Sequence, residues 1–191
     1  MKNKWKFLYN PFERIAGWKA FGIGITILAI TTIAGYFGNT VFYGLSVKSV
    51  LETTLSSAFL LQALGLAVTV GVMYIVALIS AKHVRFQDIL GTVALAKYPL
   101  LLLAILSLPL GPKIATIDVE AILHNWLAMP DLAILVVFGI LSIIVVVWEV
   151  ALLYNAFKVS TNLRSRKCVA LFIISLLISE FITLILKNLL V

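Results

Sequence analysis

Residues 89–110 read ILGTVALAKYPLLLLAILSLPL, an apolar run with a single charged residue, Lys97, near its middle. A helix of about 20 apolar residues is long enough to cross the hydrocarbon core of a bilayer. The Lys97-Tyr98-Pro99 step should interrupt this helix, because proline has no N–H to donate and clashes with the preceding turn. Three helix-breaking residues should end it, namely Pro109, Gly111 and Pro112.

Similar apolar runs make up most of the chain. Hydrophobic residues account for 62% and charged residues for 12% of the 191 residues, against about 45–50% and about 25% in soluble domains. This composition does not fit a soluble fold. We predict an all-α, polytopic membrane protein. Its five-helix transmembrane bundle occupies residues 20–191, with spans at about 20–37, 50–81, 89–110, 132–154 and 168–190.

Two helix ends carry local signals. Gly38-Asn39 is a left-handed stop for the first span. Ser49-Val50-Leu51-Glu52 has the S-x-x-E form of a capping box, so the second helix should begin there.

Within the second helix, Ala63, Ala67 and Gly71 place a small residue at every fourth position. Such a stripe suits close helix packing, either within the chain or with a second copy.

Lys and Arg are distributed unevenly over alternate connections. Eleven of them fall on the side that contains the amino terminus, and only Lys48, Lys113 and Lys187 fall on the other. Because Lys and Arg are retained in the cytoplasm, we predict a cytoplasmic amino terminus and an outside carboxyl terminus. The net charge of +7 then reflects topology and contact with anionic headgroups rather than nucleic-acid binding.

Residues 1–19 should form a cytoplasmic amphipathic segment. Asn10-Pro11-Phe12-Glu13 supplies a cap residue and a proline at the first helical position, so we expect a short interfacial helix to begin there. Aromatic and basic residues interleave, as in segments that lie among lipid headgroups. This segment is a topology anchor or, with the basic connection after the fourth span, an interaction surface. The candidate surface residues are Trp5, Phe12, Arg14, Trp18, Lys158, Arg164, Arg166 and Lys167.

Besides Lys97, two acidic residues lie inside spans: Glu149 in the fourth and Glu180 in the fifth. At about 1.5 Å per residue, Lys97 lies roughly 12 Å, Glu149 about 8 Å and Glu180 about 18 Å from the cytoplasmic ends of their spans. A lone charge in the bilayer costs at least about 2.5–3.5 kcal/mol on insertion scales. We therefore predict an ion pair between Lys97 and Glu149, and a buried Glu180 without a partner at its own depth.

Two interpretations of this candidate intramembrane polar site, which includes the adjacent Tyr98, stay open. In the structural interpretation, Lys97 and Glu149 form an internal clasp, and Glu180 is protonated or hydrogen-bonded to Ser, Thr or Tyr. In the functional interpretation, these residues bind or relay an ion, a proton or a lipid headgroup, as intramembrane ionisable groups often do.

No residue pattern indicates catalysis, a metal or a cofactor. The chain lacks H-E-x-x-H, G-x-S-x-G, paired intramembrane aspartates and a phosphate-binding glycine loop. His83 and His124 lie far apart and outside the spans, and Cys168 is the only cysteine. We predict a protein that is not an enzyme and that holds no metal or cofactor.

A set of short segments is informative in combination. The segments are Asn10-Pro11-Phe12 before the first span, residues 85–90 (RFQDIL), residues 94–101 (ALAKYPLL), Trp148, and residues 154–167, whose second part leads into the last span. Together they resemble the Yip (Ypt-interacting protein) domain family in its short bacterial form. The resemblance covers nearly the whole chain and implies five transmembrane helices with a cytosolic amino terminus.

For eukaryotic members, the resemblance implies binding of prenylated Rab-type GTPases, association with one another, and effects on vesicle formation or membrane shape. This sequence lacks the long amino-terminal extension with its Tyr-Gly-Pro motif, and Lys97 replaces the small residue usual before the Tyr of the third span. These departures argue against Rab-type GTPase binding. They favour an integral protein of a bacterial inner (cytoplasmic) membrane.

The sequence thus favours a Yip-family-like integral membrane protein that acts through protein or lipid interactions, in a membrane-organisation or trafficking-type role. Membrane lipids are the expected partners, with other membrane proteins or self-association as further candidates. The alternative is a small transporter or channel that uses Lys97, Glu149 and Glu180.

Overall fold

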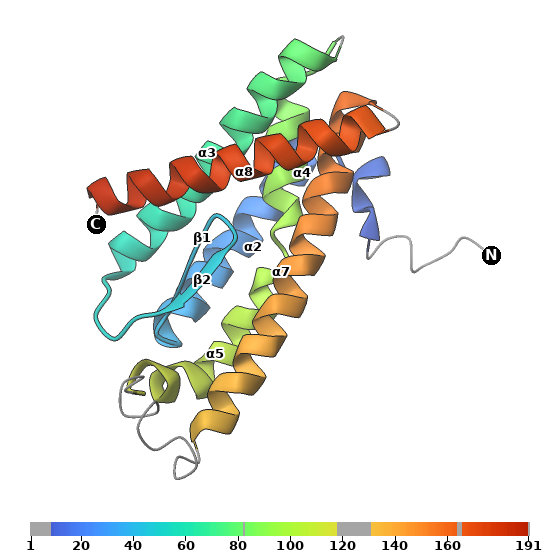
Figure 1. Cartoon of the computed structure of the whole chain (residues 1–191). Coiled ribbons are helices and arrows are strands. Elements are labelled where there is room, and N and C mark those ends of the chain that lie inside the picture. Colours follow the sequence, from blue (N-terminus) through green and yellow to red (C-terminus); the bar gives the residue numbers. More distant parts are fainter. Residues whose placement is uncertain (1–8, 82, 118–130, 164–165, 191) are drawn as a thin grey trace, which may run out of the picture.

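The computed structural model describes residues 9–81, 83–117, 131–163 and 166–190 and is predominantly helical (Figure 1). The elements are η1 (Pro11–Glu13), α2 (Gly17–Phe37), β1 (Thr40–Tyr43), β2 (Ser46–Ser49), α3 (Leu55–Ser80), α4 (Phe86–Ala96), α5 (Leu100–Ala115), α7 (Asp131–Thr161) and α8 (Arg166–Leu190). Among these residues, five helical segments are long and apolar enough to cross a membrane, with α4 and α5 forming one of them. The predicted five-span integral membrane protein is confirmed in this respect.

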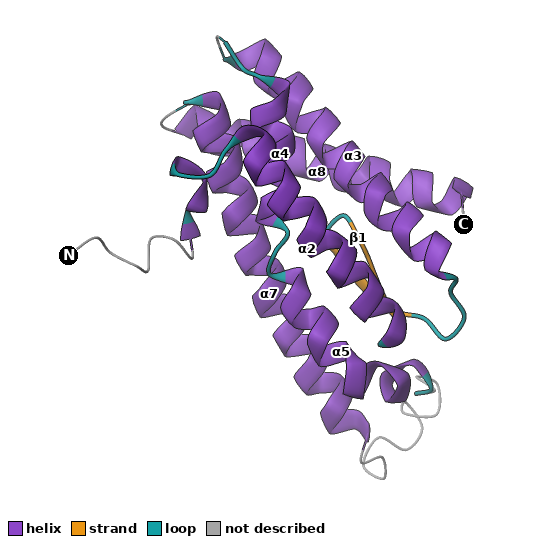
Figure 2. Ribbon diagram, turned by 180° about the vertical axis from the view of Figure 1, so that it is seen from behind, coloured by secondary structure: helices purple, strands orange, loops and turns teal. Residues whose placement is uncertain are grey.

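The helices form two groups with a hairpin between them. α2 packs against α4 and α5, α7 packs against the same two helices, and α3 pairs with α8. The β1–β2 hairpin contacts α2, α3 and α5, and Figures 1 and 2 show it between the α3–α8 pair and the other helices. Its turn points toward α8 in the interior of the bundle (Figure 1). The hairpin therefore enters the bundle instead of lying across its end.

This hairpin was not predicted from the sequence. β1 and β2 are antiparallel, with Thr40 opposite Ser49 and Tyr43 opposite Ser46, and all four residues of β1 are buried. Gly44 takes the first position of the two-residue turn with φ +57°, as such turns require. Non-helical backbone is tolerated at membrane depth only where protein surrounds it and pairs its polar groups. Strand pairing and burial meet that requirement here.

The predicted start of the second helix is wrong, and the reason lies in the hairpin. Ser49 ends β2 instead of capping a helix, because its backbone is extended opposite Thr40. α3 begins at Leu55, where the Thr54 hydroxyl accepts a hydrogen bond from the Ser57 N–H at 3.2 Å. The predicted end of the first span is confirmed: Gly38 caps α2, and Asn39 has φ +48°.

The third span breaks where the sequence predicts. α4 ends at Ala96, α5 begins at Leu100, and the intervening residues form a tight turn in which the Leu100 N–H bonds to the Lys97 carbonyl at 3.1 Å. The predicted end at residue 110 is wrong, since α5 continues through Pro109 and Pro112. Prolines are tolerated inside membrane helices when surrounding protein compensates for the lost hydrogen bond.

The predicted amphipathic interfacial helix at the amino terminus is not supported. Within residues 10–16, the regular structure is a single 3₁₀ turn, Pro11–Glu13, and Asn10 bonds to the Glu13 side chain instead of a backbone N–H. Phe12 is 1% exposed and packs in the main hydrophobic core. An aromatic residue that the bundle can bury gains more from the core than from the headgroup region. Trp5 lies outside the described residues.

The small-residue stripe of α3 does not pack against the described part of the chain. Ala63 and Ala67 are exposed, and a Cβ added to Gly71 would meet nothing within 4 Å. The face of α3 that meets the hairpin instead carries Gly65, where an added Cβ would collide with the Gly44 backbone N. Packing with a second copy or another partner stays a prediction for the stripe.

Two glycines of α2 provide a matched test of helix packing. A Cβ at Gly24 would lie 2.6 Å from the Ala94 carbonyl carbon and 2.6 Å from the Leu95 N, whereas a Cβ at Gly22 would meet nothing within 4 Å. We expect Gly24→Ala to force α2 away from α4 and to destabilise the protein by about 1–3 kcal/mol, as overpacking does. Gly22→Ala should leave the melting temperature in detergent unchanged or raise it. Equal melting temperatures for the two variants would contradict this α2–α4 contact.

Candidate functional site

The three charged residues of the predicted polar site meet at the turn of the hairpin. The Lys97 Nζ lies 2.9 Å from the Gly44 carbonyl oxygen and 2.8 Å from Glu149 Oε1. Glu180 Oε1 accepts a hydrogen bond from the Leu45 N–H at 3.0 Å. The turn after α4, helix α7 and helix α8 thus each contribute one charged side chain to a cluster around two backbone groups of the hairpin. We name Lys97, Glu149 and Glu180 the polar cluster.

The predicted ion pair between the third and fourth spans is present. Lys97 and Glu149 are 1% and 0% exposed, and theirs is the ion pair found among the described residues. Lys97 follows the last residue of α4 and has lost the helical backbone conformation there. The break in the span therefore frees its side chain to reach both α7 and the hairpin.

Glu180 is partly exposed and not fully buried as predicted, and it has a partner that was not predicted from the sequence. Its expected partners were Ser, Thr or Tyr side chains, but the observed donor is the backbone N–H of Leu45. A Cβ on Gly44 would lie 2.6 Å from Glu180 Oε1, so glycine allows the carboxylate to approach the turn. The available signal was a Gly between two short β-prone runs, TVFY and SVKS, which is a hairpin pattern.

The charges of the polar cluster do not balance if every group is ionised. Two carboxylates then face one ammonium group, and Glu149 Oε2, which is buried, has no hydrogen-bond partner among the described residues. An uncompensated charge in an apolar interior is costly. Glu149 depends on Lys97 for compensation of its charge, whereas Glu180 is partly exposed.

Tyr98 lies beside this cluster and connects the helix break to α7. Its ring packs edge-to-face on Trp148, with the centroids 5.4 Å apart. Trp148 directly precedes Glu149 in the sequence. Edge-to-face aromatic pairs stabilise a contact beyond the area that they bury. The pair therefore helps to hold α7 against the residues that follow α4.

The structure changes the composition of the candidate interaction surface. Phe12 is buried and cannot belong to it, while Trp18 is 64% exposed. The Asn155 amide donates to the Tyr9 carbonyl at 2.8 Å, which places the amino-terminal segment beside the end of α7. The other exposed members are Arg14, Lys158, Arg166 and Lys167. Trp5 and Arg164 lie outside the described residues.

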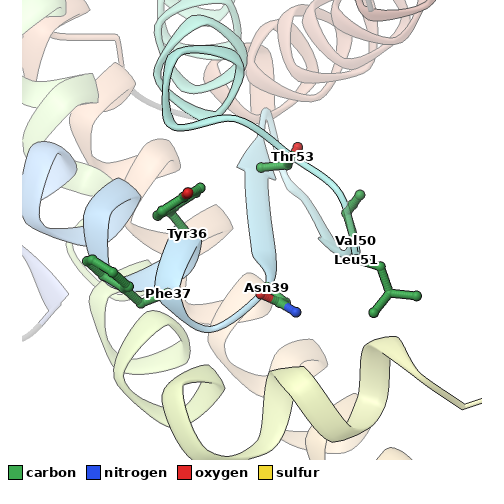
Figure 3. A pocket seen from close by; sticks show the side chains of 6 residues that line it. All are labelled: Tyr36, Phe37, Asn39, Val50, Leu51 and Thr53. Carbon is green, nitrogen blue, oxygen red and sulfur yellow. The ribbon is translucent and has the colours of Figure 1, made fainter.

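Hollows at the opposite end of the bundle were not predicted. Figure 3 shows one of about 260 Å³ where α2 ends, with side chains of α2 on one side and residues 50–53 on the other. Its lining consists of Tyr36, Phe37, Asn39, Val50, Leu51 and Thr53. These hollows form where the chain enters and leaves the hairpin. Hydropathy does not predict them, because it does not predict the hairpin.

Fold and site together define the protein as a polytopic integral membrane protein whose membrane-length helices enclose an ion pair and a hairpin. The family model described as the Yip1 domain matches residues 5–186. Because that match covers nearly the whole chain, the protein belongs to the Yip1 domain family. No curated protein and no solved structure matches the chain.

The Lys97–Glu149 pair can be tested by removing one or both partners. Lys97→Met leaves Glu149 and the Gly44 carbonyl buried without their donor, and loss of one partner of a buried ion pair typically costs about 3–5 kcal/mol. We expect a strongly lowered melting temperature in detergent. Adding Glu149→Leu should restore part of the loss, because it removes the stranded carboxylate.

Lys113→Met is the matched control, since Lys113 is an exposed lysine near the end of α5. It should unfold like the wild type. A Lys97→Met protein with the same melting temperature as this control would show that the ion pair contributes nothing to stability.

Proposed function

We propose that this Yip1-family protein is not an enzyme and acts through contacts with lipids and with other membrane proteins, in a membrane-organisation role. One observation supports this proposal above the others. Lys97 and Glu180 bond to hairpin backbone, and Glu149 bonds to Lys97. The charged groups inside the bundle are therefore engaged in holding the fold, which leaves the outer surface for function.

The basic end of the molecule is the proposed working surface. Exposed Arg14 and Trp18 lie near the start of α2, and exposed Lys158 and Arg166 lie where α7 ends and α8 begins. Basic residues beside an aromatic side chain suit a surface that meets anionic headgroups. We call this the basic face.

The proposed location is a bacterial inner membrane, with the amino terminus in the cytoplasm and the carboxyl terminus outside. The support is the uneven distribution of Lys and Arg over alternate connections. In this orientation the basic face is cytoplasmic. Membrane lipids are the first proposed partners, and the outward stripe of Ala63, Ala67 and Gly71 is the proposed contact for a second copy or another membrane protein. Binding of Rab-type GTPases is not proposed.

A small transporter is the alternative, and one observation favours it. Glu149 Oε2 is buried without a hydrogen-bond partner among the described residues, and ionisable residues inside membrane spans often mark proton or ion pathways. The two proposals differ in what they require of the polar cluster. Transport requires a carboxyl group that gains and loses a charge, whereas a structural cluster requires only its hydrogen bonds.

The basic face can be tested with a variant that removes its charge. We expect Lys158→Gln, Arg166→Gln and Lys167→Gln, combined in one protein, to reduce the anionic lipid that co-purifies with the protein in its native lipid shell, as quantified by mass spectrometry. Lys113→Gln removes an exposed positive charge at the other end and should change nothing. Unchanged lipid and protein partners in the triple variant would count against the basic face.

Glu180 separates the structural role from transport. Glu180→Gln keeps an oxygen that can accept from the Leu45 N–H but cannot ionise, while Glu180→Leu keeps neither property. For a structural residue we expect Glu180→Gln to melt near the wild-type temperature and Glu180→Leu to melt clearly lower. Purified protein in sealed vesicles should show no proton or ion flux above that of empty vesicles. A wild-type flux that Glu180→Gln abolishes would establish the transporter instead.

A further inference from the structure

A second polar hollow, of about 370 Å³, lies between the hairpin, the start of α3 and the end of α8. Its lining comes from four different segments, so the hollow is formed by tertiary packing and not by one local turn. Its main side chains are Tyr43 and Lys48 of the hairpin, Glu52 of the following loop, Leu61 of α3, and Lys187 and Asn188 of α8. We call it the hairpin pocket.

Among the described residues, the two lysines of the hairpin pocket form no ion pair, although Glu52 lines the same pocket. The ion pair found among the described residues joins Lys97 and Glu149, so Lys48 and Lys187 are unpaired in that part of the chain. The Lys187 Nζ lies 5.1 Å from the centroid of the Tyr43 ring, and Tyr43 is itself only 7% exposed. A cation held over a buried aromatic ring has a fixed position. The pocket therefore presents two positive charges and the one negative charge of Glu52, and the Tyr43 ring orients the Lys187 ammonium group.

The depth of the hairpin pocket matches the headgroup region. Lys187 lies roughly 10 Å beyond Glu180 along α8. α3 begins nearby at Leu55. Ends of membrane-length helices lie at the boundary between hydrocarbon and headgroups. The lysines therefore face the level at which lipid phosphates lie.

The hairpin pocket combines this charge with an apolar wall and with room beside it. Val41 and Leu61 line it and are 3% and 4% exposed. Val50 and Thr53 belong to its lining and also to that of the hollow in Figure 3. A ligand with a charged head and an apolar tail would meet both kinds of surface there.

We propose that the hairpin pocket binds the phosphate group of a phospholipid in the leaflet at this end of the bundle. Lys48 and Lys187 donate to the phosphate oxygens, and the side chains of Val41 and Leu61 contact the first part of the lipid's apolar region. Glu52 stands at the same pocket and is available to the hydroxyl or amine groups of the headgroup. This site is at the opposite end from the basic face. A negative binding result for the hairpin pocket would therefore not count against the function proposed above.

Binding is measured on the full-length, delipidated protein in detergent. Phosphatidylethanolamine and phosphatidylglycerol are titrated separately, and lipid-bound protein is quantified by native mass spectrometry. Diacylglycerol, which has the same tails and no phosphate, is the headgroup control. We expect the wild type to bind both phospholipids and to bind diacylglycerol much more weakly. Equal binding of diacylglycerol would overturn the proposal.

Variants of the lysines locate the site. Lys48→Gln and Lys187→Gln should each weaken phospholipid binding about tenfold, the size expected for the loss of one charge-assisted hydrogen bond. Lys187→Arg should retain most of the affinity, and Lys113→Gln should retain all of it. Melting temperatures near that of the wild type establish that the variants are folded. A folded Lys48→Gln/Lys187→Gln protein with wild-type affinity would overturn the proposal.

Inorganic phosphate distinguishes a lipid from a soluble ligand. If free phosphate binds with the same dependence on Lys48 and Lys187 while phospholipids do not bind, the hairpin pocket is a soluble-anion site and the lipid proposal is wrong. Competition between free phosphate and phospholipid for the wild type, with the lipid binding more tightly, is the expected result.

Discussion

The fold depends on one ammonium group that serves two acceptors. The Lys97 Nζ bonds to the Gly44 carbonyl and to Glu149 Oε1. Water is absent from the hydrocarbon region, so a hairpin can lie there only if protein groups satisfy its turn. Lys97 satisfies the carbonyl and Glu180 satisfies the next N–H. Glu149 balances the lysine, and the break after α4 frees that lysine from helical geometry. The three charged residues, which are costly inside a membrane, thus allow the turn of the hairpin to be buried.

Burial of the hairpin also depends on the absence of side chains around it. A Cβ on Gly35 would lie 2.6 Å from the Thr40 carbonyl oxygen, and one on Gly65 would collide with the Gly44 backbone. A Cβ on Gly111 would collide with the Gly38 carbonyl, next to the point where the chain enters β1. α2, α3 and α5 therefore each offer glycine where the hairpin or its entry passes. The polar contacts fix the turn, while the glycines give its strands the space between the helices.

Much of this architecture follows from the sequence, and what does not has local causes. Hydropathy predicts the five membrane-length segments, Pro99 predicts the break, and similar depth in the bilayer predicts the Lys97–Glu149 pair, because each of these features depends on one dominant physical effect. The hairpin was missed because two strands of four residues carry little periodicity. Without the hairpin, Ser49 resembled a helix cap and Glu180 had no partner. The core position of Phe12 depends on tertiary packing, which a local aromatic and basic pattern does not encode.

The polar cluster bears on how charges inside membrane spans are interpreted. Charged residues inside membrane spans suggest transport, because burying a charge in hydrocarbon is costly and such residues are usually functional. A buried hairpin gives such residues a structural role, since its turn needs a hydrogen-bond donor and a hydrogen-bond acceptor inside the bundle. The ammonium group of Lys97 and the carboxylate of Glu180 meet these two needs, one for each backbone group. Among the fully buried atoms of the described part of the chain, Glu149 Oε2 is the cluster oxygen that exceeds this structural requirement. A transport function that used that oxygen would have to do so without releasing Lys97 from the turn, which is a narrow constraint on its mechanism.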